Sequence, residues 1–345
     1  MTNPYISGWG KCLPNAEVKN HQLEQIIDTS DKWIKERTGI QSRRYSNLDT
    51  ADMAIHAARE AMACAGTESS DIDFIIVATT TPESLIPNTA SKVQQALQAN
   101  CGCIDINAAC SGFIYSCGMA SALIQSNKYK NILVIGAEKL SFFINWKKRD
   151  TAVLFGDGAG AIILSATDEN IGIINYELQN EAINRDDMTC DFGANINKKN
   201  YIPQDLYIKF NGKSIFKNAV LSMSKISQDI LQKSNMKTND IDWVIPHQAN
   251  IRIIKALVEK MGIEDNKVIT NIDKYGNTSS ASIPIAICEA VENNKIKPYQ
   301  NILSTTFGAG LSCGAMVYKW GKRVTPKYKN KHQKPNFATE FSLQE

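Results

Sequence analysis

Two strand-like segments of the sequence recur about half a chain length later, and this repeat restricts the fold more than any other feature. "SSDIDFIIVATT" (69–80) resembles "TNDIDWVIPHQA" (238–249), with Asp71 matching Asp240. "NILVIG" from Asn131 and "NILSTT" from Asn301 then share Asn-Ile-Leu at almost the same offset. Matches at nearly one offset indicate two copies of one unit. Coincidence is the alternative, because buried strands share a composition.

Apolar segments and helical patterns alternate along most of the chain. We expect strands at 73–80, 131–138, 152–166 (two strands around the glycine turn "GDGAG"), 242–249, 267–272, 301–310 and 313–320. We expect helices at 50–65, 88–99, 112–127, 214–234, 250–261 and 281–293, where apolar residues recur every three or four positions. This alternation predicts an α/β fold with largely buried sheets.

The repeat and the composition of the chain end suggest three regions. We place a boundary near residue 170, so that 1–170 and 171–320 form two halves. The last segment, 321–345, is rich in Lys and poor in apolar residues. It is expected to be a basic, mobile tail.

The composition argues against several classes of protein. Hydrophobic residues make up 43% and charged residues 21%, which are ordinary values for a globular protein. A net charge of +3 does not indicate nucleic-acid binding. Neither a long apolar run nor a signal-like start is present, so we expect no membrane partner and a cytoplasmic protein. The 9 cysteines are scattered and odd in number, which fits reduced thiols; only Cys101 and Cys103 lie close together, too few for zinc.

Cys110 stands in "DINAACSGF" (105–113), where an apolar segment ends and a helical pattern begins. Its small neighbours permit a sharp strand-to-helix turn, a setting that exposes nucleophiles. Unpaired N–H groups and the dipole at a helix N-terminus stabilise a thiolate. The alternative is a small core residue, because free cysteines are usually buried.

His247 and Asn277 are further candidates in the second half. His247 ends the strand-like "WVIP", and ligand crevices form at strand ends in α/β sheets. A loop histidine with satisfied hydrogen bonds is the alternative. Asn277 follows Gly276 in "DKYGNTSSASIP", which alone is explained by turn chemistry. The glycines of "FGAGL" (307–311) allow backbone N–H groups to approach a ligand.

Six segments occur together in one order: "DTSDKWIKERTGIQSRR", "AACSGF", "LFGDGAGA", "PHQANIRII", "YGNTSSASIP" and "FGAGL". In this combination the chain resembles β-ketoacyl-acyl carrier protein synthase III, one of the thiolase-like condensing enzymes. The resemblance extends over residues 4–320. It implies a thiolase-like fold with duplicated halves in a five-layered αβαβα arrangement. It also implies a homodimer that uses coenzyme A thioesters as substrates and no cofactor or metal.

The resemblance implies that an acyl-CoA primer loads Cys110. A malonyl thioester on acyl carrier protein then loses carbon dioxide and attacks the acyl group. His247 and Asn277 would donate hydrogen bonds to the enolate oxygen that forms. The backbone N–H groups of Cys110 and Ala309 would stabilise the oxyanion on the acyl group.

The resemblance also implies binding residues. Coenzyme A would contact Trp33, Arg37, Arg149 and Asn250, and Ile86 would help close the acyl pocket. The acidic carrier protein would dock on Lys217, Arg252, Lys255 and Lys260. Glu259 interrupts this basic run, and Ile86 replaces a common aromatic residue, so the acceptor and the primer stay open. The resemblance implies a role in fatty-acid initiation or in specialised, polyketide-type metabolism.

Two other functions compete with condensation. One is an acyltransferase, or a ketosynthase that uses free coenzyme A thioesters, with a different acceptor. The other is a catalytically silent subunit that pairs with an active partner. Cys110, His247 and Asn277 are all present, which favours condensation, because acyl transfer alone needs no enolate-stabilising pair.

Overall fold

Two sheets form the framework of the computed structural model, which describes residues 2–191 and 206–342. The first sheet has the order β1-β7-β6-β4-β5. Its strands are β1 (Asn3–Cys12), β7 (Asp157–Thr167), β6 (Asn131–Lys139), β4 (Phe74–Ala78) and β5 (Gly102–Ile106). The second sheet has the order β11-β12-β13-β8. Its strands are β11 (Trp243–Pro246), β12 (Asn301–Gly308), β13 (Ser312–Lys319) and β8 (Gly172–Asn180).

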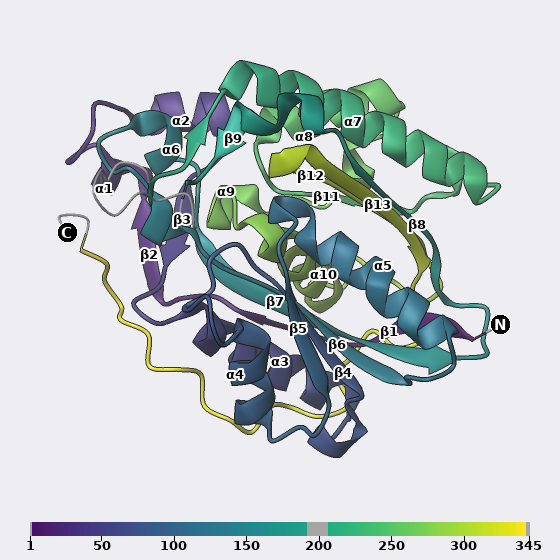
Figure 1. Ribbon diagram of the computed structural model, residues 1–345. Helices are drawn as coiled ribbons and strands as arrows, with labels where there is room; N and C mark the ends of the chain where they lie inside the picture. The colour runs from purple at the N-terminus through teal and green to yellow at the C-terminus, as the bar shows by residue number, and fades with distance from the viewer. Residues whose placement is uncertain (1, 192–205, 343–345) are drawn as a thin grey trace.

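Helices cover both outer faces and fill the space between the sheets (Figure 1). The outer face of the first sheet packs against α3 (Thr50–Ala65) and α4 (Thr89–Leu97). The second sheet is covered by α7 (Gly212–Lys233), which packs on α8 (Ile251–Met261). Between the sheets lie α5 (Gly112–Gln125) and α10 (Ser282–Glu292). The expected α/β fold with five αβαβα layers is thus confirmed.

Shorter elements flank these layers. They are β2 (Ala16–Lys19), β3 (Ser42–Tyr45), β9 (Met188–Thr189), β10 (Lys209–Phe210), α1 (Asn20–Leu23), α2 (Asp31–Thr38), α6 (Arg149–Ala152) and α9 (Ile272–Tyr275). Among the described residues, no helix combines the length and the apolar character needed to cross a bilayer.

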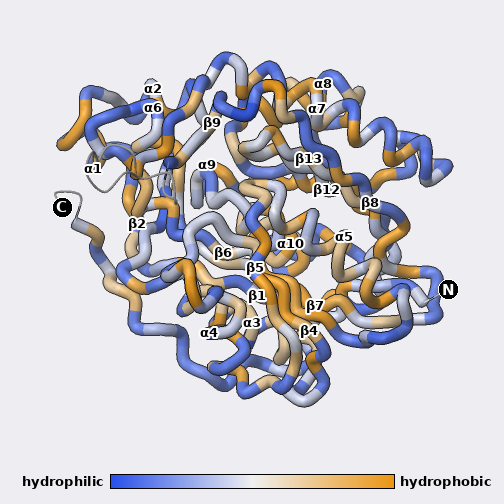
Figure 2. Tube along the Cα trace, viewed as in Figure 1, coloured by the Kyte–Doolittle hydropathy of each residue, from blue (hydrophilic) through white to orange (hydrophobic). Residues whose placement is uncertain are grey.

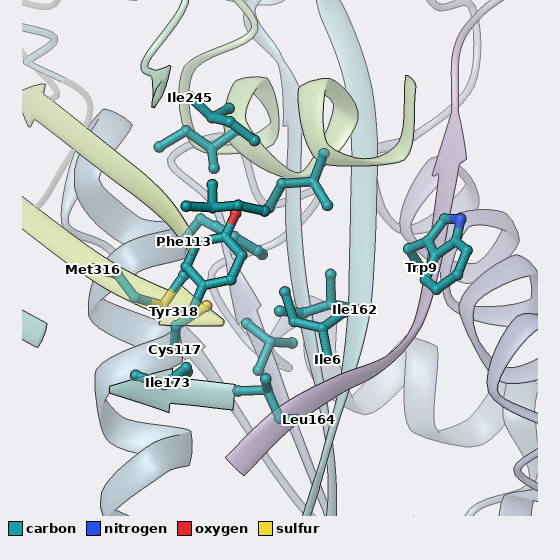
Figure 3. Close-up of a cluster of buried hydrophobic side chains, with 14 of the residues drawn as sticks. Ile6, Trp9, Phe113, Cys117, Ile162, Leu164, Ile173, Ile245, Met316 and Tyr318 are labelled. Carbon is teal, nitrogen blue, oxygen red and sulfur yellow. The ribbon is translucent and has the colours of Figure 1, made fainter. Parts of the chain in front are cut away.

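The largest buried cluster lies between the two sheets (Figure 3). It joins Phe113 and Cys117 of α5 to Ile162 of β7 and Tyr318 of β13. Figure 2 shows that hydrophobic residues follow the strands of the first sheet, whereas hydrophilic residues dominate the outer loops. Both central helices are therefore apolar on most sides, because each faces a sheet on two flanks.

The two halves repeat the same hydrogen bonds at the start of their central strands. β4 pairs in parallel with β6, and β11 pairs in parallel with β12. The Asp73 carboxylate accepts the N–H of Asn131 at 2.9 Å, and Asp242 accepts the N–H of Asn301 at 2.8 Å. Asp73 and Asp242 are the second aspartates of the matching Asp-Ile-Asp segments, so these segments and the two Asn-Ile-Leu segments form the same strand-pairing contact in both copies.

The halves also repeat a strained turn before each central helix. The short 3-10 turns η2 (Ala109–Ser111) and η8 (Ser279–Ala281) precede α5 and α10. Ala109 and Ser279, which begin these two turns, both have a φ of 48°, which is unfavourable for residues other than glycine. The end of β6 packs on η8, and the end of β12 packs on η2. Each strand end thus reaches the turn of the opposite half.

Most expected elements are present, but two are wrong. Residues 152–166 do not form two strands, because β7 runs unbroken through the glycines. A side chain at Gly160 would place its Cβ 2.7 Å from the backbone of Ile285, so glycine allows α10 to lie against the strand. Residues 267–272 form no strand, and only Val268 makes an isolated bridge, to Val244. The short α9 begins at Ile272 instead.

The C-terminal segment crosses the outer face of the first half, passing α4 and α3 (Figure 1). The N–H of Lys327 donates to the carbonyl of Cys64 at 3.0 Å. Phe337 is buried in the cluster that α3 forms with the sheet, and Phe341 lies 4.9 Å from the ring of Tyr45. The described part of this basic segment is therefore packed against the first half of the chain. Its aromatic residues Phe337 and Phe341 make these contacts. Its mobility and the boundary near residue 170 stay predictions.

Candidate active site

A cavity of about 810 Å³ brings the three main sequence candidates together. Cys110, His247 and Asn277 line it, although they come from η2, the end of β11 and the turn before η8. All three are buried, with 8%, 2% and 6% of their surface exposed. The ends of strands from both halves therefore converge on one site, as expected for an α/β sheet.

Cys110 is held where β12 meets the turn before α5. Its carbonyl accepts a hydrogen bond from the Thr306 hydroxyl at 3.0 Å. A Cβ atom at Gly308 would lie 2.8 Å from the Cys110 nitrogen, so only glycine allows this close approach. Gly308 also lines the cavity, and Ala309 follows it directly.

The Cys110 thiol is not a stable thiolate in this site. Burial raises its pKa to about 12, and the nearby Glu138 carboxylate adds to this shift. The neighbouring Ser279 side chain and the N–H of Cys110 itself lower the pKa, but their effect is weaker than that of burial. The sequence predicts that the helix N-terminus stabilises the thiolate, but the desolvation of the buried thiol outweighs this effect. The resting site therefore holds a thiol, and its reaction requires a proton acceptor.

His247 is a neutral imidazole with one nitrogen engaged. Its Nδ1 lies 2.7 Å from the Ser282 hydroxyl at the first turn of α10. The Ser282 oxygen also accepts the N–H of Gln248 at 3.4 Å, so the Ser282 hydroxyl proton can be donated to Nδ1 of His247. Burial lowers the pKa of His247 to about 3. This arrangement favours the tautomer with the proton on Nε2, which can donate a hydrogen bond without releasing a charge.

Asn277 is fixed by its backbone and by its own side-chain oxygen. Its N–H donates to the Leu154 carbonyl at 2.8 Å, and its carbonyl accepts the N–H of Gly156 at 3.0 Å. Its Oδ1 accepts the N–H of Ser279 at 2.8 Å. Because the oxygen is occupied by this donor, the amide NH₂ remains available to donate.

The mouth of the cavity carries most of the expected coenzyme A contacts. Trp33, Arg37 and Asn250 line it. The Asn250 amide donates to the Arg37 carbonyl at 3.1 Å, which ties α8 to α2. The guanidinium of Arg149 lies 4.7 Å from the centre of the Trp33 ring, in the geometry of a cation–π contact.

The remaining candidates lie outside the cavity, apart from one. Arg252 lines the mouth and lies 5.7 Å from the Phe216 ring. Lys217 on α7 and Lys255 and Lys260 on α8 are exposed but do not line the cavity. Ile86 is 90% exposed and is not among the lining residues of this chain's cavity. Its role in an acyl pocket stays a prediction.

Sequence reasoning missed three polar residues behind the site. Ser279 and Ser282 belong to the Ser-rich run "NTSSAS", which leads into the helix expected at 281–293. Glu138 ends the strand-like "NILVIGAE", and this lone charge at the end of an apolar segment was the available signal. Within 2–191 and 206–342, no three or more His, Cys, Asp or Glu side chains are grouped to hold a metal ion.

Comparisons with known families agree with this site. The model of the "3-Oxoacyl-[acyl-carrier-protein (ACP)] synthase III C terminal" family matches residues 231–320. The model of "3-Oxoacyl-[acyl-carrier-protein (ACP)] synthase III" matches residues 104–182. The two matches contain the segments around Cys110, His247 and Asn277.

Individual relatives match nearly the whole chain. A protein of Vibrio cholerae named β-ketoacyl-[acyl-carrier-protein] synthase III 2 is 49% identical over 340 residues, covering 97% of this chain and 94% of the relative. The structure of a 3-oxoacyl-[acyl-carrier-protein] synthase III from Aquifex aeolicus has a TM-score of 0.87 and 43% identity, covering 92% of this chain and 100% of the other. A priming β-ketosynthase of the R1128 polyketide pathway has a TM-score of 0.88 and 29% identity, covering 92% and 96%.

Proposed function

Because the chain belongs to the 3-oxoacyl-[acyl-carrier-protein] synthase III family, we propose that it joins an acyl-CoA primer to a malonyl thioester carried by acyl carrier protein. The product is a β-ketoacyl thioester two carbons longer. The observation that supports this most directly is the single cavity lined by Cys110, His247 and Asn277. It combines a nucleophile with two neutral hydrogen-bond donors, and no bound cofactor is needed.

The first half-reaction loads the primer. The Cys110 sulfur attacks the acyl-CoA carbonyl, the new C–S bond forms, and coenzyme A leaves as the old C–S bond breaks. The oxyanion of the intermediate would receive hydrogen bonds from the N–H groups of Cys110 and Ala309. The close packing of Gly308 on Cys110 supports this pair, because it brings the two backbone segments together.

The second half-reaction releases carbon dioxide and forms the carbon–carbon bond. Loss of the malonyl carboxylate puts negative charge on the thioester oxygen, and His247 and Asn277 would donate hydrogen bonds to it. One such donor in a water-excluded site contributes about 3 kcal/mol. Two neutral donors suit this step, because burial keeps His247 uncharged. The resulting carbanion attacks the acyl group on Cys110, which leaves as a thiolate.

Substrate binding is assigned to the mouth of the cavity. Trp33, Arg149, Arg37 and Asn250 would hold coenzyme A, with the indole and guanidinium providing flat surfaces for the adenine. The exposed cations of α7 and α8 would attract the acidic carrier protein. They are Lys217, Arg252, Lys255 and Lys260.

We further propose a homodimer in the cytoplasm. β5 is an edge strand, and Ile104 on it is 39% exposed. Leu85 and Ile86 (70% and 90% exposed) lie before α4, whose first N–H groups bind Asp105 of β5. An unpaired apolar edge favours pairing with a second copy. Cys12, Cys64 and Cys117 are buried free thiols, which fits a reducing compartment.

The test is intact-protein mass spectrometry after incubation with a panel of acyl-CoAs, with Cys110→Ala as the control. We expect an acyl adduct on the wild-type chain and none on the variant. The loaded enzyme should then turn over malonyl-acyl carrier protein with release of carbon dioxide. If the adduct forms but only another nucleophile removes it, the chain is an acyltransferase. If no acyl-CoA gives an adduct, the proposal is wrong.

A further inference from the structure

Glu138 is a fully buried carboxylate at the end of β6, directly behind the cavity. Its Oε2 accepts hydrogen bonds from the backbone N–H and hydroxyl of Thr80 at 3.0 and 2.9 Å and from the Thr81 hydroxyl at 2.9 Å. Its Oε1 accepts the hydroxyls of Ser279 at 3.0 Å and Ser280 at 2.9 Å. So many donors hold a charge that would otherwise be very costly to bury.

The two serines differ in what else they contact. Ser279 also lies beside the Cys110 thiol, because the turns η2 and η8 pack against each other, so it connects the nucleophile to Glu138. Ser280 has a second acceptor instead, the carbonyl of Ala78 at 2.9 Å. The Ser280 hydroxyl can therefore still donate a hydrogen bond, to the Ala78 carbonyl, when Glu138 no longer accepts one. Ser279 has a positive φ of 48°, a backbone conformation that is unfavourable for residues other than glycine and that clusters at functional sites.

We propose that Ser279 and Glu138 form a proton relay for Cys110, and that Glu138 holds the thiol proton between the two half-reactions. This inference rests on the proposed condensing function. During loading, the thiol proton passes to the Ser279 oxygen while the Ser279 proton passes to Oε1 of Glu138. Both hydrogen bonds then reverse, so that Glu138 donates to Ser279 and Ser279 donates to the sulfur.

The protons and charges balance over the complete cycle. Before loading, the site holds a neutral thiol and the Glu138 anion. After loading, it holds a neutral thioester and neutral Glu138, while coenzyme A leaves as a thiolate and takes a proton from water. During condensation, Cys110 leaves as a thiolate and recovers its proton from Glu138 through Ser279.

The relay neutralises Glu138 before the negatively charged malonyl group enters the site. Burial raises the pKa of both Cys110 and Glu138, so the environment disfavours an anion at either place. A malonyl carboxylate that enters next would meet repulsion from an ionised Glu138 in a low-dielectric site. If Glu138 is protonated in the acyl-enzyme, the malonyl group and the later enolate carry the only negative charge there.

The first test compares two neighbouring serines by rapid-quench mass spectrometry of acyl loading. The probe is acetyl-CoA, or the acyl-CoA of the panel that loads the wild-type chain fastest. Ser279→Ala should load about 100-fold more slowly, as expected for loss of acid–base assistance. Ser280→Ala loses a hydrogen bond to the same oxygen but no contact with the thiol, and it should stay within about threefold of wild type. Equal rates for the two variants would overturn the relay.

The second test detects the stored proton directly. Infrared difference spectra of acyl-enzyme minus free enzyme should show a new protonated-carboxyl band, which is absent in Glu138→Gln. Glu138→Asp should recover part of the loading rate that Glu138→Gln loses, because it restores the acceptor. A wild-type acyl-enzyme without the band would overturn the relay while leaving the condensing function intact. If wild type forms no acyl adduct, both the condensing function and the relay are wrong.

Discussion

The Nδ1 atom of His247 lies 2.7 Å from the hydroxyl oxygen of Ser282, and the two residues are buried together where β11 ends and α10 begins. The hydroxyl occupies the ring nitrogen that faces away from the reaction. It therefore determines which nitrogen carries the proton and how the ring is oriented. A residue that never contacts substrate is thus expected to influence the decarboxylation step.

Replacing Ser282 by Ala should slow condensation and spare acyl loading. The imidazole would lose the partner that selects its tautomer, at a cost of about one hydrogen bond, or up to about tenfold in rate. Stopped-flow loading and malonyl turnover are measured on the same preparation. Ser121→Ala removes a buried serine on α5 whose hydroxyl donates to the Cys117 carbonyl, and it serves as the control. Equal losses in both steps would indicate a packing role only.

Replacing His247 by Ala should separate the half-reactions more strongly. Loading should continue, because the thiol does not depend on this ring, whereas decarboxylation should fall about 10²–10³-fold with the loss of one oxyanion donor. Release of labelled carbon dioxide from malonyl-acyl carrier protein reports the second step. Undiminished release would contradict the assignment of His247 to the enolate.

The depressed pKa of His247 should make stability depend on pH. The native state keeps the ring neutral down to about pH 3, whereas an ordinary histidine takes up a proton below about 6.5. As pH falls through this window, the unfolded chain binds a proton that the native chain does not, so stability is lost. Urea denaturation at pH 7.5 and 5 should show a smaller drop for His247→Gln than for wild type. An equal drop would mean that the native imidazole titrates normally.

Reversing the charge of Arg252 should weaken use of the carrier protein. We expect the KM for malonyl-acyl carrier protein to rise roughly fivefold, about the 1 kcal/mol of an exposed ion pair, and the effect to shrink with added salt. Loading from acyl-CoA should change little. Lys295→Glu, an exposed cation just beyond α10, is the matched control. A loss that affects loading equally would remove Arg252 from the docking surface.

The sequence predicted the layers better than it predicted the chemistry behind the site. Periodicity placed α3 at its observed bounds, and the alternation of apolar segments identified the central strands. The glycines of β7 led to the wrong prediction of a turn. In the sequence, a glycine that allows a helix to approach a strand cannot be distinguished from a glycine in a turn. Glu138 and Ser279 could not be paired in advance, since they lie 141 residues apart and meet only where the halves interlock.

The two repeated turns lie at equivalent positions of the two halves, which indicates that the chain arose by gene duplication. The offset that relates the two Asn-Ile-Leu segments also relates Cys110 to Ser280 and Glu138 to Gly308. One copy thus kept a thiol at its turn and an acid at its strand end, while the other has a hydroxyl and a bare backbone at the same places. An ancestral chain with identical halves would have presented the same turn twice. The two turns then diverged. The turn with Cys110 now carries the reactive group, and the turn with Ser280 provides part of its surroundings.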